Sequence, residues 1–185
     1  LWNRAILSIA TVRRNLTYKL RSDLVLDSVE TDSVFVELTD LRIVVGCIYR
    51  KPNSDVKSFN ILMDNLLTKI NSENKIGYIA GDFNINILKS CTHADTGNFV
   101  DCLFSNLFLP TINRPTRITD SSITLIDNIF TNAPLVNPLS CVLYSDISDH
   151  LHVFVVTDLE NSSSQKPRCY YSRNFGDSNV QKFNS

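Results

Sequence analysis

The stretch IGYIAGDFN at residues 76–84 decides how the rest of the sequence is interpreted. Its first five residues form a continuous apolar run, which is typical of a strand buried on both faces. Asp82 and Asn84 follow at the carboxyl end, and in an extended segment residues two apart point to the same side. The two side chains either converge on one ligand or belong to a turn that uses Gly, Asp and Asn for their backbone tolerance.

The sequence on the amino-terminal side of this strand predicts a hairpin and a helix. Two β-rich runs at 34–38 and 42–49 indicate the hairpin. Apolar residues at steps of three and four then predict a helix that starts after Ser54 or Asp55 and ends near Asn71.

The sequence on the carboxyl-terminal side predicts a polar loop at 89–96 and a second helix from about 98 to 106. Four strand-like runs follow, at about 111–118, 123–131, 139–144 and 151–157. The polar stretch after Glu160 has the composition of a linker. Strand, helix, strand, helix and several strands in this order predict an α/β or α+β domain built from packed layers.

The composition fits one globular domain and gives little direct information about partners. Apolar residues make up 43% of the 185 residues and charged residues 20%. The net charge of −1 provides no overall attraction to nucleic acid, so binding of DNA would need a local basic patch. No apolar run is long enough for a membrane span. The five cysteines include no Cys-x-x-Cys pair, which argues against a structural zinc site and fits a reducing intracellular compartment.

Two further segments carry groups suited to acid–base chemistry. In the tripeptide SDH at 148–150, a histidine beside an aspartate can act as an oriented base or a proton-bearing electrophile. Taken alone, such a pair more often fills a solvated polar turn. Asp127 interrupts an otherwise apolar strand, where an unpaired carboxylate would be costly to bury. It either holds an imidazole in the correct tautomer or occupies an edge position that faces water.

Tyr49, Arg50 and Thr116 are candidates for phosphate contacts. Tyr49 ends the second run of the hairpin and is followed by Arg50, and hydroxyl and basic groups suit phosphate oxygens. Tyr49 alone is better explained as an aromatic residue at a strand edge. Thr116, in the segment RPTR at 114–117, fits an ordinary loop equally well.

Taken in order, these segments resemble the endonuclease/exonuclease/phosphatase superfamily. The ordered set is VGCIYRKP at 45–52, GDFN at 81–84, RPTR at 114–117, TLIDNIF at 124–130 and SDH at 148–150. More narrowly, the set is similar to the apurinic-type endonuclease of non-LTR (LINE-like) retrotransposons. The resemblance implies a partial four-layer α/β/β/α sandwich over residues 23–158, after a divergent segment at 1–22 and before a linker or tail at 159–185.

The resemblance also implies a role for each candidate residue. Asp82 would position or deprotonate the attacking water, or assist the leaving oxygen, and Asn84 would bind the scissile phosphate. His150, held by Asp127, would stabilise phosphate charge or act as a base. Tyr49 would contact the phosphate.

By the same resemblance, Thr116 and Arg50 would contact nucleic acid, and Asp149 would lie near a divalent metal, Mg²⁺ or Mn²⁺. The family's early strand ending in Asn and its second strand ending in a metal-binding Glu are not visible before Tyr49. We therefore expect an N-terminally truncated domain whose complete form nicks DNA.

The resemblance further implies DNA as the partner, a C-terminal reverse transcriptase domain in the full polyprotein, no membrane, and an intracellular, nuclear location. The alternatives are a phosphatase of the same superfamily and a non-catalytic relic or binding module.

Overall fold

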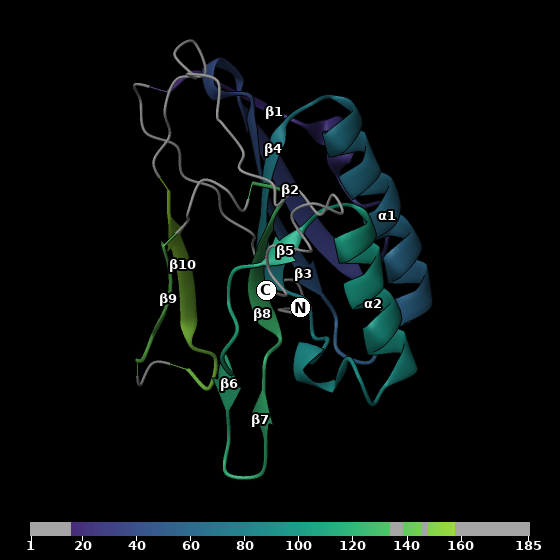
Figure 1. The fold of residues 1–185 in the computed structure, drawn as a ribbon, viewed down its shortest axis with the longest axis vertical. Helices are drawn as coiled ribbons and strands as arrows, with labels where there is room; N and C mark the ends of the chain where they lie inside the picture. The colour runs from purple at the N-terminus through teal and green to yellow at the C-terminus, as the bar shows by residue number, and fades with distance from the viewer. Residues whose placement is uncertain (1–15, 134–138, 146–147, 158–185) are drawn as a thin grey trace, which may run out of the picture.

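The main sheet is built outward from the predicted hairpin (Figure 1). The structure is a computed structural model that describes residues 16–133, 139–145 and 148–157. The strands of the sheet are, in spatial order, β1 (Tyr18–Leu20), β2 (Thr31–Leu38), β3 (Ile43–Arg50), β4 (Ile76–Asp82), β8 (Asp127–Thr131) and β5 (Leu109–Pro110). The predicted hairpin of β2 and β3 is confirmed, and β4 lies parallel to β3. The run at 76–80 is continuously apolar because β4 lies inside the sheet with a layer on each face.

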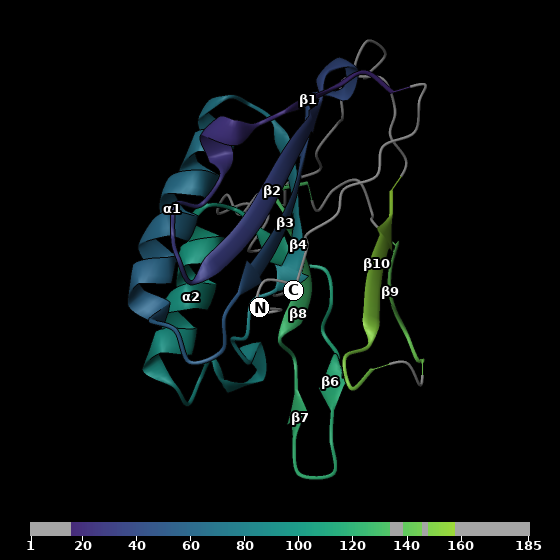
Figure 2. The same ribbon diagram turned by 180° about the vertical axis from the view of Figure 1, so that it is seen from behind.

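Two helices, α1 (Val56–Ser72) and α2 (Ala94–Ser105), cover one face of this sheet (Figures 1 and 2). Helix α1 begins after Asp55, one of the two residues predicted to cap it. The Asp55 carboxylate accepts backbone hydrogen bonds from Lys57 at 3.3 Å and from Ser58 at 2.9 Å. These bonds satisfy N–H groups that the first turn leaves without helical partners.

Helix α2 starts earlier than predicted. The expected polar loop at 89–96 is wrong from Ala94 onward, because the helix begins there after a short 3₁₀ turn at Ile87–Lys89. A ring nitrogen of His93 accepts the backbone N–H of Thr96 at 3.3 Å, and Thr96 is buried. The first turn is therefore capped and packed although its residues are polar, and a pattern of apolar residues does not reveal such a turn.

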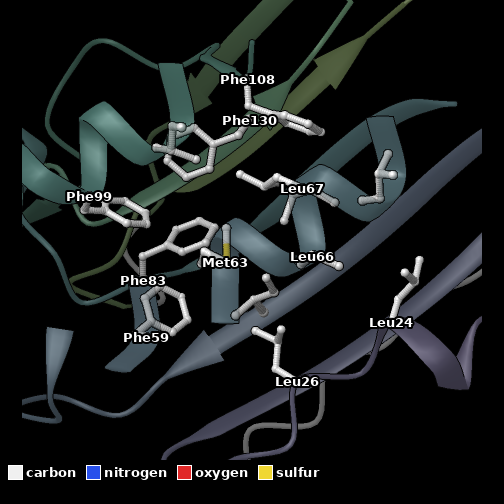
Figure 3. Close-up of a cluster of buried hydrophobic side chains, with 14 of the residues drawn as sticks. Leu24, Leu26, Phe59, Met63, Leu66, Leu67, Phe83, Phe99, Phe108 and Phe130 are labelled. Carbon is white, nitrogen blue, oxygen red and sulfur yellow. The ribbon is translucent and has the colours of Figure 1, made fainter. Parts of the chain in front are cut away.

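The core between the helices and the sheet is rich in phenylalanine (Figure 3). Phe83, from the GDFN segment, is fully buried. Its ring centroid lies 4.9 Å from that of Phe130 on β8 and 5.9 Å from that of Phe99 on α2. Because neighbours along an extended chain point to opposite faces, anchoring Phe83 among the helices turns Asp82 toward the other face of the sheet.

A second β layer lies over that other face (Figures 1 and 2). It consists of β9 (Leu139–Leu143) and β10 (His152–Val156), which pair antiparallel. Val153 and Val155 of β10 pack against an apolar cluster of the main sheet. The helices, the main sheet and this strand pair confirm the predicted α/β fold class and partial sandwich, with three layers present in the described residues.

The predicted strand runs between 111 and 131 are shorter than expected. β6 (Arg117–Ile118) and β7 (Ile123–Thr124) form a small hairpin that projects beyond the main sheet (Figure 1). The residues just before β6 do not form a strand, because the side chain of Asn128 forms hydrogen bonds with both the backbone N–H and the backbone C=O of Ile112. The Asn128 amide donates to Ile112 O at 2.9 Å, and its carbonyl accepts from Ile112 N at 3.2 Å.

The predicted domain boundaries stay predictions. Tyr18–Leu20, within the predicted segment 1–22, pairs with β2. The predicted tail at 159–185 lies outside the described residues. No helix in the described ranges combines the length and the apolar character needed to cross a membrane.

Candidate active site

Three predicted site residues form a row across adjacent strands. Tyr49 on β3 is the register partner of Asp82 on β4, and Asp82 is in turn the partner of Asp127 on β8. Partners in neighbouring strands present their side chains on the same face of a sheet. Asp32 on β2, opposite Tyr49, extends the row by one strand. Asp32 was not among the predicted site residues, because only the exact register of the hairpin places it beside Tyr49.

His150 reaches this row from the second layer. Its Nδ1 lies 3.1 Å from both carboxylate oxygens of Asp127. The predicted Asp127–His150 pair is therefore brought together across 23 positions of sequence. The SDH loop is held in place by backbone hydrogen bonds, from Leu151 N to Thr116 O at 2.6 Å and from Ile118 N to Asp149 O at 3.2 Å.

The side chain of Thr116 holds the backbone of Asp127 in place. It is fully buried, and its hydroxyl oxygen accepts the backbone N–H groups of Asp127 at 3.0 Å and Ile126 at 3.3 Å. The predicted contact of Thr116 with nucleic acid therefore needs correction, since no part of the side chain reaches the surface. The structure gives Thr116 the role of positioning the start of β8, where Asp127 lies.

Arg50 is also buried, with 2% of its surface exposed. Its guanidinium donates to the Ser54 hydroxyl at 2.9 Å and to Lys51 O at 3.1 Å, and it lies 5.7 Å from the ring centroid of Phe59. The alternation along β3 turns Arg50 to the helix side while Tyr49 faces the site. The predicted contact of Arg50 with nucleic acid is corrected for this reason.

The GDFN segment is both a tight turn and a carrier of site residues. Asn84 has a left-handed backbone (φ 49°), which asparagine tolerates better than most residues. Its backbone N–H donates to Asp82 Oδ1 at 3.0 Å, and its side-chain amide donates to Arg50 O at 2.7 Å. A Cβ atom at Gly81 would collide with the backbone of Ile48, so the close approach of β3 and β4 requires glycine there.

The acidic groups of the site repel one another. One ligand atom each from Asp82, Asp127 and His150 lies within 4.8 Å of the other two. Burial, and then the negative charge of Asp127, raise the pKa of Asp82 above its usual value. A pair of carboxylates this close together favours a bound cation or a shared proton.

Asp149 lies outside this group. Its carboxylate accepts from Arg117 Nε at 2.7 Å, and this ion pair lowers the pKa of Asp149 and raises that of Arg117. The predicted metal ligand is therefore engaged by a cation of the protein itself. The tripeptide motif gave no sign of this partner, which lies 32 positions away in the sequence.

Comparisons with known proteins identify the fold. A scan against models of protein families and a search of curated proteins gave no match. Among solved structures, the neighbours of this chain are proteins of the endonuclease/exonuclease/phosphatase family, and the chain has the fold of that family. The predicted resemblance is thereby confirmed at the level of the fold.

Three of these solved structures have the following similarity to this chain. The endonuclease domain of TRAS1, a telomere-specific non-LTR retrotransposon, has a TM-score of 0.60 at 13% identity, over 80% of this chain and 71% of that one. The 3′ phosphatase NExo from Neisseria, bound to a product DNA hairpin, has a TM-score of 0.56 at 12% identity, with coverages of 80% and 72%. An AP endonuclease from Archaeoglobus fulgidus has a TM-score of 0.52 at 17% identity, with coverages of 72% and 69%.

Proposed function

We propose that this chain binds a DNA phosphodiester beside Asp82, Asp127 and His150 and hydrolyses it with the help of a divalent cation, Mg²⁺ or Mn²⁺. The observation that carries the proposal is the convergence of these three side chains, from two strand ends and a loop, within 4.8 Å. The likeness of the fold to the TRAS1 endonuclease domain and to an AP endonuclease supports the choice of substrate.

The contact between His150 and Asp127 sets the chemistry of the imidazole. When Nδ1–H donates to the Asp127 carboxylate, Nε2 is the ring atom left to meet a phosphate oxygen or to take up a proton. Asp82 has a raised pKa and can accept a proton from an attacking water or return one to the leaving oxygen. Asn84 and Tyr49, at neighbouring strand ends, are the proposed contacts of the phosphate.

The residues present fit a divalent cation. Asp82 and Asp127 offer carboxylate oxygens, which hard cations prefer, and their mutual repulsion is relieved by positive charge. The chemistry supplied by such a cation is polarisation of a phosphoryl oxygen. Asp149 would first have to leave its ion pair with Arg117 to join these ligands.

Nicking of supercoiled plasmid in the presence of Mg²⁺ tests the proposal. We expect Asp82→Asn and His150→Ala each to slow nicking by at least about 100-fold, as removal of an acid–base group does. Asp101→Asn, an exposed site on α2, is the matched control and should nick like the wild type. EDTA should abolish the activity. Equal rates in all four proteins would contradict catalysis at this site.

A phosphatase is the second candidate, favoured by the likeness of the fold to the 3′ phosphatase NExo. Release of inorganic phosphate from a 3′-phosphorylated oligonucleotide, without nicking of plasmid, would support it. Salt-sensitive binding of DNA with no turnover of either substrate would instead support a non-catalytic binding module.

We further propose that the chain comes from a retrotransposon polyprotein that acts in the nucleus beside a reverse transcriptase. The order of the sequence motifs and the likeness to the TRAS1 domain support this origin. Reading the coding sequence on both sides of the chain tests it, since reverse transcriptase motifs should lie downstream in the same frame.

A further inference from the structure

The regular pairing of β4 with β8 ends at Asp82 and Asp127, the two carboxylates of the candidate site. Phe83 N still donates to Ile126 O at 2.9 Å. The chain then turns at Asn84, whose left-handed backbone takes it out of the ladder. The backbone groups just before Asp127 therefore need other partners, because a buried peptide group is costly to leave unpaired.

Asn86, which neither the motifs nor the proposed chemistry uses, supplies one of these partners. Its side-chain oxygen accepts the backbone N–H of Leu125 at 3.1 Å, across 39 positions of sequence, and that of Leu88 at 3.3 Å. Ile87 N, next along the chain, donates to Leu125 O at 3.1 Å. Leu125 is 2% exposed, so water cannot readily take over these bonds. Both backbone groups of Leu125 are thus tied to residues 86–87.

Thr116 holds the same segment, but ties it to a different part of the molecule. Its hydroxyl oxygen accepts the backbone N–H of Asp127 at 3.0 Å, and its carbonyl oxygen accepts that of Leu151 at 2.6 Å. Thr116 therefore connects the segment to the second β layer, whereas Asn86 connects it to the segment that follows Asp82. Asn86 adds to the β4–β8 ladder a second link between the segments that carry the two carboxylates.

We propose that Asn86 is a positioning residue, which fixes the spacing of Asp82 and Asp127 and thereby the affinity of this pair for a divalent cation. Asn86 acts through the backbone of Leu125, two residues before Asp127, and through the turn at Leu88. Groups that orient the side chains around a metal typically change its affinity by about 10–100-fold.

Binding of Mn²⁺ to the full chain, followed through the electron paramagnetic resonance of the free ion, tests this role without DNA. The role rests on the proposed function for the cation, but cation binding is measured without turnover. Asn86→Ala removes both hydrogen bonds and should weaken Mn²⁺ binding at least about tenfold. Asn86→Asp keeps an oxygen that accepts from Leu125 and Leu88, since the two bonds use only the carbonyl oxygen of Asn86, and should restore the affinity.

Two controls separate positioning from stability and from charge. Asn132 also uses its side-chain oxygen to hold a backbone N–H of the sheet, that of Gly77 at 2.8 Å, but it does so where β4 begins. Asn132→Ala should therefore lower the free energy of unfolding, measured in urea, and leave Mn²⁺ affinity unchanged. The added charge of Asn86→Asp attracts Mn²⁺ by itself, so the restoration is measured again in 1 M KCl, where the screening length is about 3 Å.

The outcomes distinguish this role from the proposed function. Equal Mn²⁺ affinity in Asn86→Ala and Asn132→Ala would overturn the positioning role, even if nicking depends on Asp82. A restoration by Asn86→Asp that disappears in 1 M KCl would overturn it as well, because charge and not the hydrogen bonds would then explain the affinity. Weakened Mn²⁺ binding by Asn86→Ala, in a protein whose nicking does not depend on Asp82, would uphold the positioning role and reject the nuclease.

Discussion

The two ends of the main sheet both hold poorly solvated charges, but the charges are arranged in opposite ways. At the end where β4 begins, Arg21 donates to Glu37 at 2.8 Å and to Glu73 at 2.7 Å. Lys75 donates to the same two carboxylates, at 2.7 and 2.6 Å. Although burial opposes it, Lys75 and then Arg21 hold the pKa of Glu37 below its usual value. At this end each carboxylate is paired with positively charged side chains.

At the end where β4 terminates, two acids lie side by side. Asp82 and Asp127 are register partners, and both burial and this neighbour raise the pKa of Asp82. Within the described residues, the His150 imidazole contacts the carboxylate of Asp127 by hydrogen bonds and makes none to Asp82. Removing one partner of a buried ion pair is strongly destabilising, whereas unmatched charges are tolerated where a ligand later supplies the missing charge. We therefore call the first end, with Arg21, Glu37, Glu73 and Lys75, the structural end. We propose that the second, with Asp82 and Asp127, is the functional end.

Glu37→Gln is the change that most strongly tests the structural end. Glu37 is 5% exposed, and its loss leaves Arg21 and Lys75 each short of a charged partner in a poorly solvated place. We expect the free energy of unfolding to fall by about 3 kcal/mol, as it does when one partner of a buried pair is removed. Urea denaturation measures it.

Asp101→Asn is the control for this experiment. Asp101 is exposed on α2, so this variant should stay within about 0.5 kcal/mol of the wild type. A Glu37→Gln protein as stable as this control would remove the distinction between the two ends of the sheet.

Acid should weaken the structural end over a defined range of pH. Arg21, and then Lys75, lower the pKa of Glu73 from 4.5 to about 2. A carboxyl whose pKa is lower in the folded than in the unfolded chain stabilises fully above pH 4.5, and this contribution is lost as the pH falls from 4.5 to about 2. Unfolding free energies measured by urea across that range should decline more steeply in the wild type than in Glu73→Gln. Parallel curves would refute the linkage.

Local signals account for the parts of the fold that could be predicted. The hairpin, the cap at Asp55 and the strand at 76–80 each depend on residues close together in the sequence. The early start of α2 was missed because His93 and Thr96 make a polar cap rather than an apolar pattern.

The site was predictable only in part, because its contacts are distant in sequence. The order of the motifs suggested the Asp127–His150 pair, which the structure brings together. The burial of Arg50 and Thr116 depends on strand alternation and on packing against distant segments. Asp32 joins the row only through the register of β2 against β3. No short motif contains that information.

Asp82→Asn tests the functional end, and its expected effect on stability is the smallest and has the opposite sign. Asparagine keeps a carbonyl oxygen to accept the Asn84 N–H, so the turn is preserved. It removes the repulsion from Asp127 and the cost of burying a charge, and we expect the free energy of unfolding at neutral pH to rise by up to about 1 kcal/mol, as substitutions at strained functional sites can do.

The pH dependence of this gain separates repulsion from other causes. The pKa of Asp82 is higher in the folded than in the unfolded chain, so wild-type Asp82 stabilises most when protonated, below pH 3.8, and this contribution is lost as the pH rises through its folded pKa. The advantage of Asp82→Asn, measured by urea denaturation, should therefore shrink in acid. A loss of stability at neutral pH comparable with that of Glu37→Gln would mean that Asp82 belongs to a stabilising network. The unmatched charge could then no longer be taken as the mark of a functional site.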